Sequence, residues 1–171
     1  MIMDYQNLLA QIYQEILPFA SEGMQADYIP PLAKVDPDQF GICLETVNKE
    51  VFMHKDADVR FSIQSISKVF ALAMALSLKG ESLWKKVGKE PSGTAFNSLV
   101  QLELESGKPR NPFINAGAIV VADILLTELE RPEEEFIGFI RALCEDDSVD
   151  YNMDVAISER ENGYLNAAIA N

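Results

Sequence analysis

Histidine and cysteine are scarce in this sequence of 171 residues. His54 is the single histidine, so neither a serine–histidine triad nor a histidine-based zinc site can be assembled from the chain. The two cysteines, Cys43 and Cys144, lie far apart and match no metal-binding or redox spacing. Without histidine chemistry, lysine gains weight as a candidate base.

Cationic residues are also few. The chain has 14 Lys and Arg against 27 Asp and Glu, which gives a net charge of −13. Nucleic acids and anionic membranes bind proteins through lysine and arginine patches, so we expect neither as a partner. The glutamates of residues 128–135 fit a solvated helix surface, and the acids of residues 145–150 lack the spacing of an EF-hand loop.

Long apolar runs are missing as well. The apolar run Val69–Leu78 is too short to span a bilayer. With 48% hydrophobic residues, the chain can bury a core as a single domain over residues 1–171. No cationic, apolar leader precedes the first predicted helix and the cysteines fit reduced thiols, so we expect a cytoplasmic protein. We also expect it to form a homo-oligomer.

What the sequence does contain is a serine and a lysine three residues apart at the start of that apolar run. Ser65 and Lys68 would share one face of a helix, and a helix that is apolar all round must be buried. Burial lowers the pKa of a lysine, so Lys68 could accept the Ser65 proton and activate a serine nucleophile. The pattern indicates acyl transfer through a serine ester. The motif alone is equally compatible with Ser65 as a helix cap and Lys68 reaching out to water.

A second pair with the same spacing, Ser82 and Lys85, shows how weak this motif is by itself. It follows Gly80, which should end the apolar helix, and it lies in a polar stretch. We interpret it as a chance match whose lysine is solvated and charged.

Hydrophobic periodicity predicts an N-terminal helix that ends near Pro18. Alternating residues predict a hairpin formed by residues 40–47 and 51–54, followed by a third strand over Val59–Ile63. Residues 86–111 are rich in Gly, Pro, Ser and Asn and are expected to be irregular.

Three further helices are predicted in the second half of the chain. Asn115–Leu126 should be a buried helix whose small residues permit close packing. Pro132 and the acids after it fit a helix N-terminus. Ser158–Glu161 has capping-box spacing and should begin a helix that carries Glu159 and Asn166 two turns apart on one face.

Several ordered blocks of the sequence closely resemble the serine-dependent glutaminases of bacteria and mitochondria. The blocks are Ala26–Pro30, Gln64–Lys68, Val87–Gly93, Asn111–Val120 and Ser158–Glu161. The resemblance implies an α+β fold of the β-lactamase and penicillin-binding group, with a helical cluster and an antiparallel sheet. It also implies hydrolysis of L-glutamine to L-glutamate and ammonia, without a metal or an organic cofactor.

The same resemblance implies roles for individual residues, with Ser65 as nucleophile and Lys68 as its general base. The positions implied to contact the substrate or to orient the dyad are Ser65, Gln64, Asn115, Glu159, Asn166 and Tyr28. Glutamine carries an ammonium group, which suits Glu159, and a carboxylate and an amide, which suit neutral donors and acceptors. Taken without the family, these residues fit ordinary helix-start, helix-dipole, surface and packing roles.

Family members supply further site groups and strands that would lie beyond Asn171. We therefore expect residues 1–171 to be a single catalytic domain truncated before its C-terminal half, with an incomplete sheet. Two other classes stay open. One is a β-lactamase-like acyl hydrolase, which would share the serine–lysine dyad, and the other is a noncatalytic fragment or interaction module.

Overall fold

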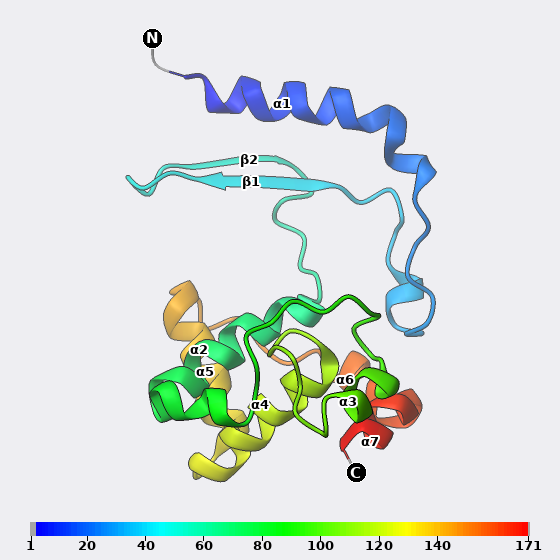
Figure 1. The fold of residues 1–171 in the computed structure, drawn as a ribbon. Coiled ribbons are helices and arrows are strands. Elements are labelled where there is room, and N and C mark those ends of the chain that lie inside the picture. The colour runs from blue at the N-terminus through cyan, green and yellow to red at the C-terminus, as the bar shows by residue number, and fades with distance from the viewer. Residues whose placement is uncertain (1–2, 171) are drawn as a thin grey trace. The chain divides into compact units, whose positions relative to one another are not determined.

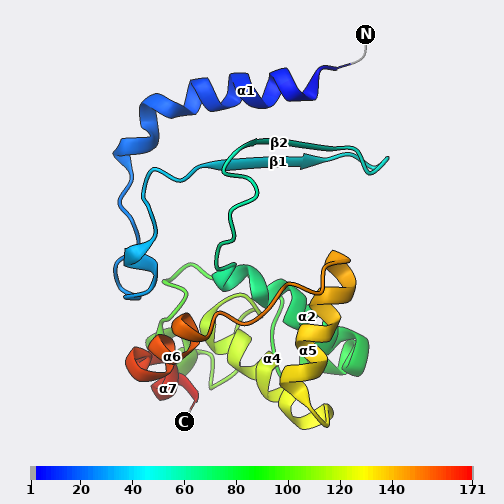
Figure 2. The same ribbon diagram turned by 180° about the vertical axis from the view of Figure 1, so that it is seen from behind.

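A computed structural model describes residues 3–170, and their contacts divide the chain into two units, one up to Ser62 and one from Ile63 onward (Figures 1 and 2). The first unit contains helix α1, two short 3₁₀ helices, Leu17–Glu22 and Leu32–Lys34, and one hairpin, and the second unit contains the remaining helices. Within residues 3–170, no helix combines the length and the apolar character needed to cross a membrane.

The first unit pairs helix α1, Tyr5–Ile16, with a hairpin of β1, Gly41–Glu45, and β2, Val51–Lys55. The strands are antiparallel, and the predicted hairpin is confirmed. Alternate hairpin residues are half-buried, and two of them, Phe52 and His54, lie against tyrosine rings of α1. The ring of Tyr5 lies 5.3 Å from that of Phe52. The predicted N-terminal helix is also confirmed, and it ends just before Pro18.

The third strand predicted over Val59–Ile63 is wrong. The described residues contain one sheet, and it has two strands. A turn follows β2 directly, closed by a hydrogen bond of 3.0 Å from the Val59 backbone N–H to the Asp56 carbonyl. Strand-forming residues need a neighbouring strand to pair with, and after this turn residues 60–63 have none in the described structure.

The second unit is helical. Its helices are α2 Ser67–Lys79, α3 Leu99–Leu104, α4 Asn115–Glu128, α5 Pro132–Cys144, α6 Met153–Asn162 and α7 Tyr164–Ala170. Helix α4 packs against α2 and α7. The prediction that Pro132 begins a helix is confirmed. Residues 86–111 are irregular as predicted except that they include α3.

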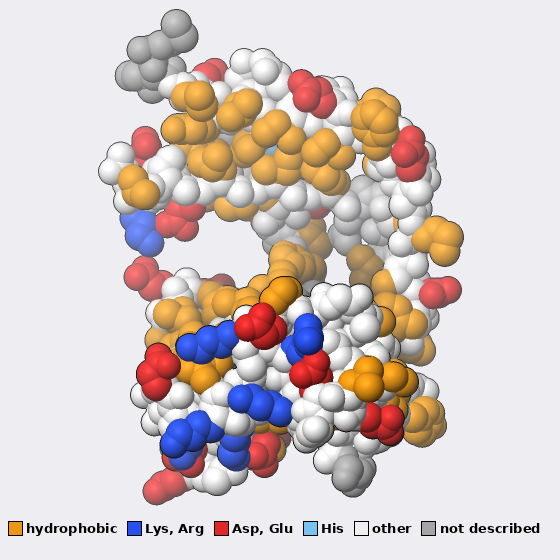
Figure 3. Space-filling view, viewed as in Figure 1, with side chains coloured by type: hydrophobic (Ala, Val, Ile, Leu, Met, Phe, Trp, Pro, Cys, Tyr) orange, Lys and Arg blue, Asp and Glu red, His pale blue; other side chains and the backbone are white. Residues whose placement is uncertain are grey.

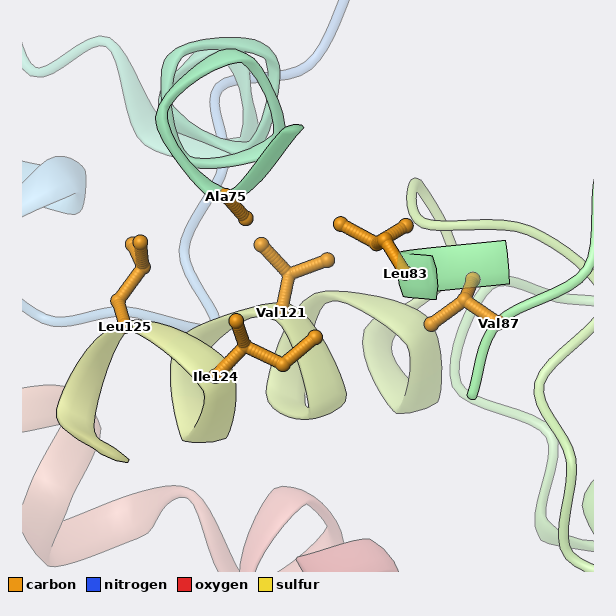
Figure 4. Close-up of a cluster of buried hydrophobic side chains, with 6 residues drawn as sticks. All are labelled: Ala75, Leu83, Val87, Val121, Ile124 and Leu125. Atoms are coloured by element: carbon orange, nitrogen blue, oxygen red, sulfur yellow. The ribbon is translucent and has the colours of Figure 1, made fainter. Parts of the chain in front are cut away.

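The core of this unit lies between α2 and α4 (Figure 4). Its buried members are Ala75, Leu83, Val87, Val121, Ile124 and Leu125. The prediction of a buried α4 is confirmed. The prediction that the apolar α2 is buried all round is wrong, because Ala75 is its one fully buried residue while Val69 is 52% exposed.

Apolar side chains also gather on the face of the first unit seen in Figure 3.

The capping-box prediction at Ser158–Glu161 is wrong as well, because these residues lie inside α6. Helix α6 begins earlier, where the Asn152 side chain accepts a hydrogen bond of 3.1 Å from the Val155 backbone N–H. It ends at Gly163, and α7 follows at once. Glu159 and Asn166 therefore lie on two different helices.

The start of α4 fits tightly against the turn before it. A Cβ atom on Gly117 would lie 1.9 Å from the carbonyl oxygen of Asn111 and 2.9 Å from the Cα atom of Pro112. Both are backbone atoms that cannot move aside without shifting the turn. Glycine is therefore required here for close approach, which confirms the packing role predicted for the small residues of this helix.

Two glycine-to-alanine substitutions test this contact. Gly117→Ala should lower the free energy of unfolding by roughly 1–3 kcal/mol through overpacking. Gly138→Ala is the matched control, because a Cβ there meets nothing within 4 Å inside α5. Alanine at that position should raise stability by about 0.5–1 kcal/mol. Chemical denaturation measures both, and equal effects of the two changes would show that Gly117 is not a packing requirement.

Candidate active site

Ser65 lies in a short 3₁₀ turn, Gln64–Ile66, that leads into α2. The helix itself begins at Ser67, two residues later than the sequence predicts, and the Ser65 residue is exposed. The expectation that Ser65 points into a water-poor site is therefore not met in this structure. The turn is fastened by Ser67, whose hydroxyl donates a hydrogen bond of 2.7 Å to the Gln64 carbonyl.

The backbone of Gln64 has a φ angle of 46°, in the left-handed region that favours glycine. For another residue this conformation costs about 1–2 kcal/mol. Such strain clusters at functional sites, where the surrounding structure holds it in place. Gln64 is one of five non-glycine residues with a positive φ among those described, and it lies directly before Ser65.

Lys68, one turn into the segment, is held by the loop that precedes α4. Its Nζ donates hydrogen bonds of 3.0 Å to the Phe113 carbonyl oxygen and 2.8 Å to Asn115 Oδ1. The Phe96 ring centroid lies 6.0 Å away. Burial lowers the pKa of Lys68, in the direction predicted from the sequence. The alternative in which Lys68 reaches out to water is therefore not what the structure shows.

Asn115 connects three helices through its side chain. Its Oδ1 accepts from Lys68 on α2, and its Nδ2 donates a hydrogen bond of 2.8 Å to Asn166 Oδ1 on α7. Its backbone N–H donates a hydrogen bond of 2.7 Å to the Phe96 carbonyl. The structure thus joins Lys68, Asn115 and Asn166, residues that the sequence places 47 and 51 positions apart.

A break at Gly163 separates the helix of Glu159, α6, from the helix of Asn166, α7. The Glu159 carbonyl accepts a hydrogen bond of 2.8 Å from the Gly163 backbone N–H. A Cβ on Gly163 would lie 2.4 Å from that carbonyl oxygen, so the break needs glycine. The Asn162–Gly163 dipeptide was a turn signal in the sequence that could have revealed it.

The remaining predicted residues lie as follows. Gln64 and Glu159 are half-buried in the second unit. Tyr28 belongs to the first unit, where it is 73% exposed. The second motif match is confirmed as solvated, because Ser82 and Lys85 are both exposed and the Ser82 hydroxyl bonds to the Lys79 carbonyl at 2.7 Å.

Two groups around Lys68 were missed by the sequence reasoning. The Phe113 acceptor is a backbone carbonyl, which carries no residue-type signal. The Phe96 ring comes from a loop, and its approach to Lys68 depends on how that loop folds. Among the described residues, no group of three or more His, Cys, Asp or Glu side chains is arranged to hold a metal ion.

The mixed fold of helices and an antiparallel hairpin is that of the β-lactamase-like group, and comparison with known proteins narrows this fold group to a family. The model of the glutaminase family matches residues 23–171. The chain is 56% identical to the thermolabile glutaminase of Rhizobium etli, in an alignment that covers 98% of this chain and 55% of the relative. The chain belongs to the glutaminase family, and it spans about half the length of the curated relatives it matches.

Solved structures agree in fold. The structure of Mglu in its glutamate form is 34% identical, with a TM-score of 0.84, over 99% of this chain and 39% of that one. A probable glutaminase from Bacillus subtilis, complexed with 6-diazo-5-oxo-L-norleucine, is 29% identical with a TM-score of 0.75 over 99% of this chain and 51% of that one. The predicted α+β fold of the β-lactamase-like group is confirmed.

Replacing Asn115 by aspartate tests the electrostatics of this site. A carboxylate about 2.8 Å from the Lys68 amine would favour the ammonium form and raise the pKa of Lys68. At a fixed pH near neutrality, the fraction of uncharged amine should fall. Acylation of Lys68 by acetic anhydride, followed by peptide mass spectrometry, should then slow by up to about tenfold for each unit by which the pKa of Lys68 rises.

Asn152→Asp is the control for that experiment, since it adds the same charge at the N-terminus of α6, where aspartate is an equally good cap. Its Lys68 should react like that of the unchanged protein. Equal slowing in both variants would show a general charge effect.

Proposed function

We propose that the protein carrying this chain is a glutaminase that hydrolyses L-glutamine to L-glutamate and ammonia through a covalent serine ester. The observation that carries the proposal is the Lys68 amine, partly buried and bonded to the Phe113 carbonyl and to Asn115. Family membership and the glutamate-bound and 6-diazo-5-oxo-L-norleucine-bound relatives support the choice of substrate.

The hydrogen bonds around Lys68 suit a base. A neutral amine has two N–H donors and one lone pair, and the two oxygens at the start of α4 accept from both donors. The lone pair is then directed away from these oxygens. We propose that it accepts the Ser65 proton, and that the turn held by Gln64 and Ser67 presents the serine to it.

The proposed reaction has an acylation step and a deacylation step. Ser65 Oγ attacks the side-chain amide carbon of glutamine as its proton passes to Lys68. The ammonium of Lys68 returns that proton to the departing nitrogen, which leaves as ammonia, and an ester of Ser65 remains. Water then gives a proton to the same amine and adds to the ester carbon. The bond to Ser65 Oγ breaks, the ammonium of Lys68 returns the proton to that oxygen, and glutamate leaves. No step requires a redox partner or a metal.

Substrate recognition is proposed from charge and hydrogen-bonding type. Glu159 would hold the substrate ammonium, while Asn115 and Asn166 offer neutral donors and acceptors to the carboxylate and the amide. The substrate contact of Tyr28 stays a prediction from the sequence. A site built this way rejects analogues that leave one of these groups unpaired. A cytoplasmic location and a homo-oligomeric assembly stay predictions.

The choice of nucleophile is tested by two alanine variants of the protein. Ser65→Ala should lower the rate of ammonia release from glutamine by roughly 10⁴-fold or more, because no other group can form the ester. It should also abolish covalent labelling by 6-diazo-5-oxo-L-norleucine. Ser82→Ala, the matched control from the second motif, should keep both properties. Loss of activity in Ser82→Ala alone would reverse the assignment.

The role of Lys68 predicts a pH dependence with a definite sign. The base is active when uncharged, so the rate should rise with pH as Lys68 loses its proton, with a midpoint below the ordinary lysine pKa. Lys68→Arg should reduce the rate by about 10²–10⁴-fold and remove this rise, because arginine stays protonated. A rate that Lys68→Arg leaves unchanged would mean that the position supplies only positive charge.

Glu159→Gln tests the proposed ammonium contact. Loss of a charged hydrogen bond worth about 1.5–3 kcal/mol should weaken glutamate binding by about 10–150-fold. Calorimetric titration with glutamate measures this without any chemistry. Glu161→Gln, an exposed neighbour on the same helix, is the control and should bind normally. Unchanged affinity in Glu159→Gln would leave Glu159 with a helix role only.

A further inference from the structure

Gln101 is a buried polar residue in α3, 8% exposed, that the proposed reaction does not use. Its Oε1 accepts a hydrogen bond of 2.7 Å from the Ser92 hydroxyl and another from the Thr94 hydroxyl. Buried amide oxygens are nearly always paired, and losing such partners costs free energy. The side chain therefore ties the loop of residues 91–98, here called the Phe96 loop, to the first turn of α3.

The Phe96 loop is closed at its other end by the same helix. The Ser98 hydroxyl caps α3 by accepting a hydrogen bond of 3.3 Å from the Gln101 backbone N–H. Gln101 thus hydrogen-bonds both ends of the loop. Its side chain binds Ser92 and Thr94, and its backbone N–H binds Ser98. Between these ends Gly93 has open space around it and the Phe96 side chain is 60% exposed, so packing alone does not hold the loop.

The Phe96 loop supports the start of α4. The Phe96 carbonyl accepts a hydrogen bond of 2.7 Å from the backbone N–H of Asn115, the first residue of that helix. The first N–H groups of a helix have no partner within it, so this bond fixes where the helix begins. The Asn115 side chain in turn bonds Lys68 at 2.8 Å.

We propose that Gln101 is a positioning residue of the active site. By holding Ser92 and Thr94 it fixes the Phe96 loop, the loop fixes the first residue of α4, and Asn115 then holds the Lys68 amine. The effect of these contacts on catalysis rests on the proposed function. The contacts that link Gln101 to the start of α4 do not depend on it.

Backbone hydrogen exchange at Asn115, followed by NMR, tests the linkage without any turnover. Gln101→Leu removes the acceptor while filling a similar volume. The Asn115 N–H should then exchange about tenfold faster, because its bond to the Phe96 carbonyl opens more often. The N–H of Ile124, deep in α4, should keep its rate. A uniform acceleration of both amides would indicate only a loss of overall stability and would overturn the proposal, as would an unchanged Asn115.

The donor side of the same contact gives a second route if Gln101→Leu fails to fold. Thr94→Val combined with Ser92→Ala removes both donors, and it should accelerate exchange at Asn115 like Gln101→Leu. Thr127→Val is the matched control, because it removes an exposed hydroxyl that bonds within the far end of α4. Its Asn115 should exchange normally. Gln101→Glu, which keeps an acceptor oxygen, should restore slow exchange.

The catalytic part is read separately, from glutamine hydrolysis by the protein. Gln101→Leu should lower kcat by at least about tenfold, and Gln101→Glu should recover most of that loss. Fast exchange at Asn115 with unchanged kcat would overturn the positioning role. If the unchanged protein does not hydrolyse glutamine, the proposed function fails, and the exchange rates still decide whether Gln101 holds the start of α4.

Discussion

The candidate site depends on the bonding of one lysine amine to two oxygens at the start of α4. Lys68 enters from α2, and the Phe113 carbonyl and the Asn115 side chain meet it from the turn and helix across the core. Oxygen acceptors stabilise a charged amine, while burial destabilises it. Burial is the cause that lowers the pKa of Lys68, so the site favours an amine that can accept a proton.

The position of those two oxygens depends on backbone packing. Helix α4 can start where it does because Gly117 lets the Asn111 carbonyl approach, and because Asn111 Oδ1 accepts hydrogen bonds from the N–H groups of Phe113 and Ile114, at 3.0 and 3.1 Å. The α2–α4 core then fixes the helix against the segment that bears Lys68 (Figure 4). The packing of the core therefore also determines the geometry of the site in this unit.

Local patterns in the sequence predicted what depends on neighbours along the chain. The alternation on both sides of residues 48–50 gave the hairpin, and Pro132 with its acids gave the start of α5. The polar stretch around Ser82 and Lys85 correctly predicted that both residues are exposed, while the roles of Ser65 and Lys68 stay a prediction. Each of these inferences needs only residues within a few positions.

The errors arise where distant or competing contacts decide. Val59–Ile63 has strand-forming residues but no strand beside it among the described residues. Ser158–Glu161 has the capping-box pattern, but the helix is capped by Asn152, which lies six residues before Ser158. The groups around Lys68 include the Phe113 carbonyl and the Phe96 ring. Their positions depend on the fold, so the sequence alone does not reveal them.

The most direct test of this account is the titration of the Lys68 side chain itself, followed by NMR of its ε-methylene carbon. The account predicts that Lys68 loses its proton below the ordinary lysine pKa, because burial disfavours its charged form. A Lys68 midpoint at or above the ordinary lysine value would contradict the account, because the amine would then be charged under the conditions in which it must act as a base.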